Sequence, residues 1–525
     1  MSEKFSKENN SFGWKYGILK LLHKKGYKPT ERVIDISVPN STVVFNENML
    51  NYIENVLCYF ESCFSRKAAF RWFVTITLGL MIRSDHLGVT SIIRDLALRP
   101  ECYESMLHFF RAASWSLEEI RKRWFLAVRQ YTPLYKEGNY FVLVGDGVKQ
   151  SKEGLRMPGV KRLFQESGNS AKAEYIRGHM FGGLGILAGS PRNWACIPLS
   201  LRLHDGLQAA KGWAGASISS ASHVVQMVED AYLAACSFGD ALLLLDRYFL
   251  SVPALEKLNS LNGSGSVRLE IVTKAKKSCT AFEKPAPRKS GRGRPPKKGS
   301  TVHLKELFVC RKEEFQEAKL ELYGTQETVR YYQVDLLWGQ KLYQELRFVL
   351  VEMKGVQSIL ATTNLELDAL SIIRLYSYRF RIECTFRELK QQIGAFCYRF
   401  WSKHMPKLNR CQKKGEPAPL ERVTDEVARR KVLEAVRAIE MHMALSCIAM
   451  GILQSLSILC LGKVTSSQIR YQRTPSSGRL SEAALMHYFR KHFFRLLSKQ
   501  PDLHITQIIQ SLPENPDSFW DPLAA

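Results

Sequence analysis

Two short apolar runs that each end in aspartate, Tyr140-Phe-Val-Leu-Val-Gly-Asp146 and Ala241-Leu-Leu-Leu-Leu-Asp246, decide the fold. Such runs are typical of buried strands, and each predicts a strand that delivers an acid at its carboxyl end. Between them the pattern predicts strands at 180–187 and 195–203 and a helix at 221–235. Strands that alternate with helices favour an α/β sheet, whose sites form beyond the carboxyl ends of the strands. A single aspartate there is more often a turn former or a helix cap.

A third carboxylate lies on one long helix that we expect at 367–394. This helix carries Tyr376, Arg379, Glu383 and Lys390, at offsets of 3, 7 and 14 residues from the first. At about 100° per residue, these offsets place all four side chains on one stripe roughly 60° wide. An ion-pair lattice on an exposed helix would give the same pattern. That alternative does not explain why two upstream strands also end in aspartate.

Together these features resemble the bacterial insertion-sequence DDE transposases that carry a Y-R-E-K signature. The signature is matched by Tyr376, Arg379, Glu383 and Lys390. The earlier acids match as Val-Leu-Val-Gly-Asp146-Gly-Val-Lys and Leu-Leu-Leu-Asp246-Arg-Tyr-Phe, and a stretch like Tyr175-Ile-Arg-Gly-His-Met-Phe181 recurs between the acids of such proteins. The long gap before Glu383 also agrees, because this family inserts a β-rich segment there. The resemblance covers about residues 70–460 and implies a ribonuclease-H-like catalytic domain.

The resemblance implies that Asp146, Asp246 and Glu383 are catalytic and hold two Mg²⁺ ions, for which Mn²⁺ can substitute. Two ions about 3.5–4 Å apart activate the nucleophilic oxygen and stabilise the leaving oxygen in phosphodiester cleavage. Hard cations prefer carboxylate oxygens. We assign Asp146 to bridge both ions, and Asp246 and Glu383 to complete one each. Water attack would nick the element's end, and the freed 3′-OH would attack the opposite strand or the target. Hairpinned ends are implied by the resemblance alone.

The same resemblance implies several contacts to DNA. Tyr376 and Arg379 are expected to grip a phosphate near the cleaved end, and Lys390 to meet the backbone as a point charge. Relatives stack an extruded base on an aromatic residue of the inserted segment. Trp338 is our candidate for that role, although a tryptophan buried in the core is the default. For His179, a structural histidine is favoured over a contact with the metal site.

The inserted segment contains a strongly basic stretch, Lys284-Pro-Ala-Pro-Arg-Lys-Ser-Gly-Arg-Gly-Arg-Pro-Pro-Lys-Lys-Gly299, with no acid. Its proline and glycine content excludes a regular element. The part Gly291-Arg-Gly-Arg-Pro-Pro-Lys-Lys298 resembles an AT-hook, in which arginines enter the minor groove of A·T-rich DNA. A disordered basic loop that contacts phosphates fits equally well. In either case Arg292, Arg294, Lys297 and Lys298 are expected to bind DNA.

The composition agrees with a polyanionic partner. Lysine and arginine outnumber acids 75 to 50, a formal net charge of +25, while 45% hydrophobic residues indicate a globular chain. Neutralised phosphates release counterions, so nucleic acid is favoured over a ribosome-associated or membrane-surface role. The twelve cysteines form no C-x-x-C pair and no zinc-ligand spacing. The apolar stretch at 441–462 imitates a membrane span, but its polar residues favour a buried helix.

These observations predict a fold of the α/β class, a ribonuclease-H-like mixed sheet flanked by helices. The expected divisions are a helical DNA-binding region (1–135), the first part of the catalytic domain (136–266), an inserted β-rich segment (267–364), the catalytic helix (365–400) and a helical C-terminal region (401–525). The predicted function is that of a transposase acting on double-stranded DNA as a homodimer. The N-terminus lacks a signal-peptide pattern, so we expect a cytoplasmic, nucleoid-associated bacterial protein. A domesticated, non-catalytic DNA-binding protein and a ribonuclease-H-like nuclease are the alternatives.

Overall fold

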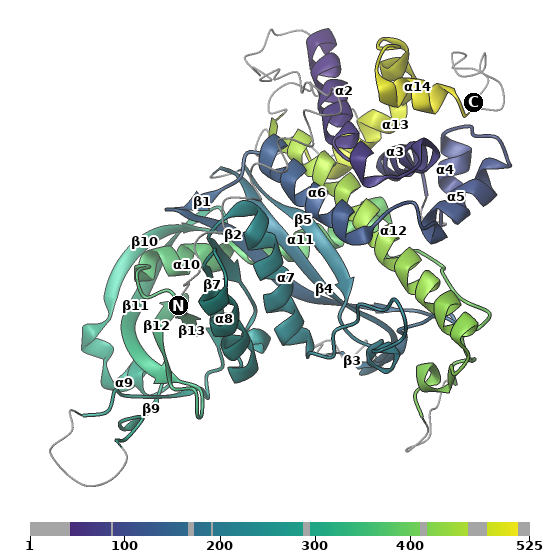
Figure 1. The fold of residues 1–525 in the computed structure, drawn as a ribbon. Coiled ribbons are helices and arrows are strands. Elements are labelled where there is room, and N and C mark those ends of the chain that lie inside the picture. The colour runs from purple at the N-terminus through teal and green to yellow at the C-terminus, as the bar shows by residue number, and fades with distance from the viewer. Residues whose placement is uncertain are drawn as a thin grey trace, which may run out of the picture. The chain divides into compact units, whose positions relative to one another are not determined.

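The two aspartate-bearing runs are neighbouring parallel strands at the centre of one mixed sheet (Figure 1). The computed structural model describes residues 42–85, 88–165, 173–190, 193–286, 295–409, 417–459 and 480–512. Strand β2 (Tyr140–Ser151) pairs in parallel with β6 (Ala241–Leu244), and β6 pairs in parallel with β7 (Leu269–Ala275). The predicted mixed α/β sheet flanked by helices is therefore confirmed.

Antiparallel strands extend the sheet on both sides of this parallel centre. On one side, β4 (Tyr175–Ser190) pairs with β2, and β5 (Asn193–Leu203) and β3 (Lys161–Phe164) both pair with β4. On the other side, β13 (Val356–Thr362) pairs with β7. The remaining strands are β1 (Lys136–Glu137), β8 (Thr280–Phe282), β9 (Thr301–His303), β10 (Gln316–Leu322), β11 (Thr325–Trp338) and β12 (Gln344–Met353). Because β7 pairs with β6, we place the start of the inserted strands at β8.

Glycines in the central strands let helices pack closely on both faces of the sheet. A Cβ on Gly145 of β2 would lie 2.7 Å from the sulfur of Met227, on helix α7 (His223–Phe238). A Cβ on Gly183 of β4 would lie 2.4 Å from the ring of Phe386, on helix α11 (Phe380–Glu388). Leu184 of β4 is the register partner of Gly145, and Gly183 that of Asp146. Because side chains alternate along a strand, α7 and α11 cover opposite faces.

Helix α12 (Glu426–Leu459) is the apolar helix of the C-terminal region. It packs on β5 and against α3 (Lys67–Ile82) and α5 (Cys102–Arg111), as Figure 1 shows. Every residue from Met441 to Ile458 is buried. Its most apolar window has a mean hydropathy of 1.6, enough for a membrane span by composition, but 89% of that window is buried inside the protein. The prediction of a buried helix is confirmed over these residues, while 460–462 lie outside the described part.

The other helices lie around the sheet and in the terminal regions. They are α2 (Thr42–Cys58), α4 (Thr90–Asp95), α6 (Leu117–Tyr131), α8 (Val252–Ser264), α9 (Leu307–Cys310), α10 (Ala369–Tyr378), α13 (Glu482–Ser498) and α14 (His504–Gln510). Apart from the start of α2, all described elements belong to one compact unit, Phe45–Ala525.

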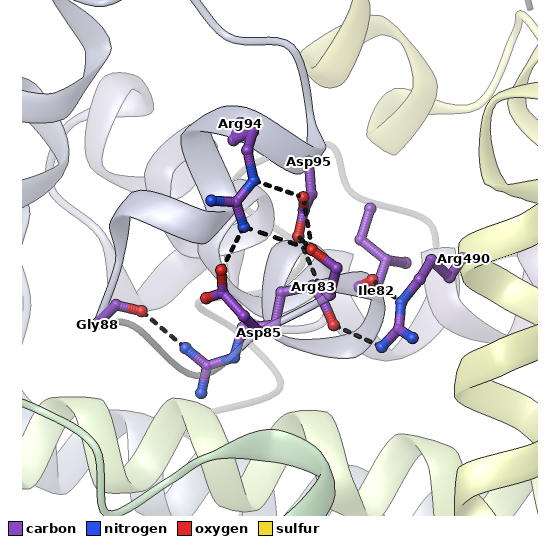
Figure 2. Close-up of polar contacts among 8 residues, drawn as sticks. Ile82, Arg83, Asp85, Gly88, Arg94, Asp95 and Arg490 are labelled. Atoms are coloured by element: carbon purple, nitrogen blue, oxygen red, sulfur yellow. Dashed lines mark hydrogen bonds and ion pairs between the residues drawn. The ribbon is translucent and has the colours of Figure 1, made fainter. Parts of the chain in front are cut away.

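A buried arginine attaches the N-terminal helices to the end of the catalytic segment. Arg83, at the end of α3, is 1% exposed, and its guanidinium donates to the carbonyl oxygens of Gly88 (2.8 Å) and Ile393. Burial lowers the pKa of Arg83 to about 10. Figure 2 shows how Arg490 of α13 donates in turn to the carbonyl oxygens of Ile82 and Arg83. These backbone contacts hold α3, α13 and residue Ile393 together.

Two sequence-based expectations need correction. The strand that carries Asp146 does not end there, because β2 continues to Ser151 through antiparallel pairing with β4. The single helix expected at 367–394 is divided into α10, α11 and a π-helical turn at Leu389–Ile393. Periodicity predicted the helical character of this segment but carried no signal for the break at Arg379, which is set by packing.

Candidate active site

Asp146 and Asp246 occupy equivalent positions on adjacent strands. The last parallel pair between β2 and β6 is Val144 with Leu244, and each aspartate lies two residues beyond it. Neighbouring strands are about 4.8 Å apart, so the register places the two acids side by side. Each carboxylate accepts a 2.7 Å hydrogen bond from the next backbone N–H, that of Gly147 or Arg247. The hydroxyl of Thr273 on β7 donates to the Asp246 carbonyl oxygen (2.9 Å).

Burial raises the pKa of Asp146 above its ordinary value. The neighbouring Asp246 raises this pKa further, whereas Arg379 and the Gly147 N–H lower it. A carboxylate with these surroundings gains from a cation, because desolvation and a like charge both disfavour its ionised form. Perturbed acids of this kind are concentrated at functional sites.

Arg379 joins two of the three predicted catalytic acids. Its guanidinium donates to Asp146 Oδ2 at 3.1 Å and, through its other terminal nitrogen, to Glu383 Oε1. The side chains of Arg379 and Asp146 are 14% and 21% exposed, and that of Glu383 is 42% exposed. Burial by itself would lower the pKa of Arg379, but the two carboxylates raise it. The structure thus gathers residues from β2 and α11 that are far apart in the sequence.

Arg379 lies at the junction of α10 and α11, and its side chain reaches Asp146 and Glu383. Arg379 is the C-cap of α10 and the N-cap of α11, with helical φ and ψ of −52° and −36°. Thr385 fastens α11 to the sheet by donating to the carbonyl oxygen of Cys196 on β5 (2.8 Å). Burial raises the pKa of Tyr376, on α10, while Arg379 lowers it and Asp246 raises it. Tyr376 therefore belongs to the same electrostatic group.

Lys390 lies beyond the regular α-helical part of this segment. It lies in the π-helical turn Leu389–Ile393, where the residues per turn exceed those of an α-helix. Its ammonium nitrogen is 5.6 Å from the centre of the Phe396 ring. The assumed 100° per residue therefore does not hold throughout the segment, and the contact of Lys390 with the DNA backbone stays a prediction.

The close packing of α11 on β4 gives a test of how this site is held. We expect Gly183→Ala to destabilise the protein by about 1–3 kcal/mol, because the added methyl would overlap the Phe386 ring. Cleavage should also slow, since α11 must move away from the strand that carries Asp146. Urea unfolding and a cleavage assay measure both effects. Gly263→Ala on α8 is the matched control, because a Cβ there meets nothing within 4 Å. Equal stability of the two variants would contradict this account.

Sequence analysis missed Tyr323, which lies in the turn between β10 and β11. Leu322 pairs with Thr325, so Tyr323 and Gly324 form a two-residue hairpin turn, with φ of 55° and 84°. A non-glycine residue at such a φ costs about 1–3 kcal/mol, and Tyr323 is 64% exposed. Desolvation raises the pKa of its phenol, with Arg379 lowering it and Glu383 raising it. The hairpin therefore brings an exposed aromatic residue toward the acids. In the sequence, the turn-forming glycine that follows Tyr323 was the signal that could have drawn attention to it.

The other predicted DNA contacts lie away from these acids or outside the described residues. Trp338 is at the end of β11 opposite the Tyr323 turn, half-buried, and its indole N–H donates to Cys279 Sγ at 3.2 Å. Lys297 and Lys298 are exposed, and the Lys298 ammonium lies 3.8 Å from the centre of the Phe282 ring. Arg292 and Arg294 fall outside the described residues.

His179 has a structural environment. It is fully buried and hydrogen-bonds to the Tyr398 hydroxyl and the Pro158 carbonyl oxygen. Burial lowers its pKa to about 3, which keeps the ring neutral. The structural interpretation of His179 therefore fits its contacts.

The acids suit a hard cation, but an arginine lies between them. Among the described residues, no three His, Cys, Asp or Glu side chains gather closely enough to hold one metal ion. Instead, the Arg379 guanidinium places positive charge between Asp146 and Glu383. Carboxylate oxygens are the ligands that Mg²⁺ and Mn²⁺ prefer. The donor set therefore fits a divalent ion, provided that Arg379 moves aside.

Comparison with known proteins adds a family. The model of a family described as DDE superfamily endonuclease matches residues 59–330, slightly more than half of the chain. The matched stretch contains Asp146 and Asp246 and ends before Tyr376, so it includes none of the four signature residues. No curated protein matches the chain.

Proposed function

This chain belongs to the DDE superfamily endonucleases, and from that premise we propose that it is a DNA transposase that cuts the ends of a mobile element and joins them to target DNA. The observation that carries the proposal is the bridge made by Arg379. The Arg379 guanidinium contacts both Asp146 and Glu383. Asp246 follows β6, the strand that pairs in parallel with the one carrying Asp146. A nuclease-type enzyme follows from the family, while strand transfer is the proposed refinement.

We propose that Asp146, Asp246 and Glu383 would hold divalent ions. When bound, such ions activate the attacking oxygen and stabilise the leaving one. The guanidinium of Arg379 holds Asp146 and Glu383 close together until then. Once released, its planar guanidinium can take a phosphate oxygen near the cleaved end by two parallel hydrogen bonds. Tyr376, beside Arg379, would add a hydroxyl contact to the same phosphate.

Tyr323 is a better candidate than Trp338 for an aromatic contact to the cleaved end. It is exposed and electrostatically coupled to Arg379 and Glu383, whereas the indole N–H of Trp338 is already bound to Cys279. Base stacking on an exposed aromatic ring contributes about 1–3 kcal/mol per base. We therefore propose Tyr323 as the residue of the inserted strands that holds DNA next to the acids.

The proposed substrate is double-stranded DNA, bound at the element ends by a homodimer. The net charge of +25 supports a polyanionic partner. Lys297 and Lys298 are exposed beside the basic stretch and are available for phosphate contacts. Lys390 would reach the backbone from the π-helical turn. A cytoplasmic location at the nucleoid follows from these proposals.

The test of this function is a strand-transfer assay. The protein is incubated with a labelled DNA that carries the sequences flanking its own coding region, and with a plasmid target. With Mg²⁺ or Mn²⁺ we expect 3′-OH ends and products joined to the plasmid, and with chelator neither. Cleavage without joined products would support a nuclease instead. Binding without any cleavage would support a domesticated DNA-binding protein.

A further inference from the structure

A hydrogen-bonded network of polar side chains lies on the face of the sheet that α7 covers, opposite the face covered by α11. Asp230 of α7 forms an ion pair with Arg202 of β5 and accepts from His204 Nε2 at 2.8 Å. His204 and His223 share a hydrogen bond between their Nδ1 atoms, also 2.8 Å long. Asp230 and His204 are 6% and 3% exposed. None of these four residues belongs to the predicted site.

Two paired glycines make room for the imidazole rings. Gly147 of β2 is the register partner of Gly182 of β4. A Cβ on Gly182 would lie 1.9 Å from the His204 ring, and one on Gly147 would lie 2.8 Å from His223 Nε2. Both rings therefore lie directly on the strand backbone. Gly147 is the residue whose N–H binds the Asp146 carboxylate.

The other side of the His223 ring meets the turn that follows Asp246. Its centre is 5.3 Å from that of the Phe249 ring and 6.3 Å from that of Tyr248. Both aromatic residues belong to the 3-10 turn Arg247–Phe249, whose first N–H binds the Asp246 carboxylate. The ring thus contacts the backbone just after one acid and side chains just after the other.

No β2–β6 backbone pair joins the two acids directly, although the register places them side by side. The ladder between β2 and β6 ends at Val144 and Leu244, before either aspartate. Beyond that point, Asp146 stays paired with Gly183 of β4, and the Asp246 carbonyl oxygen accepts from Thr273 of β7. The His223 ring lies between Gly147 and the Arg247–Phe249 turn, and it is oriented by its hydrogen bond with His204, which in turn is bound to Asp230. Burial lowers the pKa of His223 to about 3, so its ring brings no charge that would compete with a metal ion.

We propose that His223, oriented by His204 and Asp230, is a positioning residue that sets the spacing of Asp146 and Asp246 for metal binding. This inference rests on the proposed function, in which these acids hold the ions. It assigns a role to three residues on the face of the sheet that the acids themselves do not occupy. This role requires the imidazole ring of His223, which contacts Gly147 and the turn after Asp246, and the hydrogen bond with His204, which orients that ring.

The experiment measures Mn²⁺ binding by electron paramagnetic resonance, using the full chain in complex with its end DNA. We expect His223→Ala to weaken Mn²⁺ binding about tenfold, while the melting temperature and the metal-free affinity for DNA change little. His223→Phe keeps the ring but loses the hydrogen bond to His204, so its loss should be smaller, about threefold. His108→Ala on α5 is the control, because His108 is exposed and makes none of the contacts described for His223, His204 and Asp230.

Two outcomes overturn the inference. One is Mn²⁺ affinity in His223→Ala equal to that of the wild type. The other is a weakened affinity that appears only with an equal loss of thermal stability, which would mark a general structural role. If His223→Ala does not fold, His223→Phe decides the question by the same criteria. Asp146→Asn separates this inference from the proposed function: full Mn²⁺ binding by that variant would overturn the function itself.

Discussion

Replacement of Glu383 with glutamine is expected to reduce cleavage of end DNA by about 10³-fold or more, with DNA binding nearly unchanged. Losing one charged ligand of a catalytic ion removes several kcal/mol of transition-state stabilisation, and each 1.36 kcal/mol is about tenfold in rate. The amide has the same shape, and its oxygen can still accept from Arg379. The fold should therefore persist. Single-turnover cleavage with Mg²⁺ and a mobility-shift assay without metal measure the two quantities.

Glu388→Gln is the matched control for this experiment. Glu388 lies at the end of the same helix, and its carboxylate pairs with Arg387 at 3.1 Å instead of with Arg379. We expect its cleavage rate to stay within about twofold of the wild type, because this partly exposed ion pair between adjacent residues contributes little. If both variants lost cleavage equally, the loss would reflect a general sensitivity of α11 to substitution. Equal loss of cleavage and binding in Glu383→Gln would argue against a metal-binding role.

Replacement of Arg379 with alanine should tighten metal binding and slow cleavage at the same time. In the metal-free protein the guanidinium occupies the space between Asp146 and Glu383, so it competes with a divalent ion. Its removal leaves the buried Asp146 without a cation, which destabilises the metal-free protein. Mn²⁺ should restore that stability, because an ion that binds only the folded state stabilises it. We expect about tenfold tighter Mn²⁺ binding and about 100-fold slower cleavage, because the phosphate loses its bidentate partner.

Melting curves with and without Mn²⁺, combined with cleavage rates, test this pair of effects. Arg374→Ala on α10 is the control, because Arg374 pairs with Glu137 and not with the acids. That variant should show no gain in metal affinity. Weaker Mn²⁺ binding in Arg379→Ala would mean that the guanidinium assists the ions, which would refute the competition proposed here.

The elements of the central sheet were predictable because their signals are local. A buried strand needs an uninterrupted apolar run, and the runs ending at Asp146 and Asp246 identified β2 and β6 in advance. The same reasoning placed a helix at 221–235, where α7 lies, and a buried helix at 441–462, which covers the second half of α12. The errors were the end of β2 and the continuity of the helix at 367–394. Both depend on partners: β2 continues because β4 pairs with it, and the helix breaks where Arg379 meets the acids.

The site was predictable only as a set of residue types. The sequence named Asp146, Asp246, Glu383, Arg379 and Tyr376, but it could not show that a guanidinium would lie between two of the acids. It also missed Tyr323, because an exposed aromatic residue in a turn has no periodic signal. The chain of His223, His204 and Asp230 was equally invisible, because its meaning depends on the pairing of Gly147 with Gly182.

By itself, the sequence determined the class of fold and the positive charge that favours DNA, and it nominated the acids. Those properties follow from which residues are apolar, acidic or basic along the chain, and folding does not change them. Only the tertiary structure decided how the acids are spaced, that a guanidinium lies between two of them, and which side chains approach them. Those properties arise from packing between separate segments of the chain, where strand register and glycine clearances set the geometry.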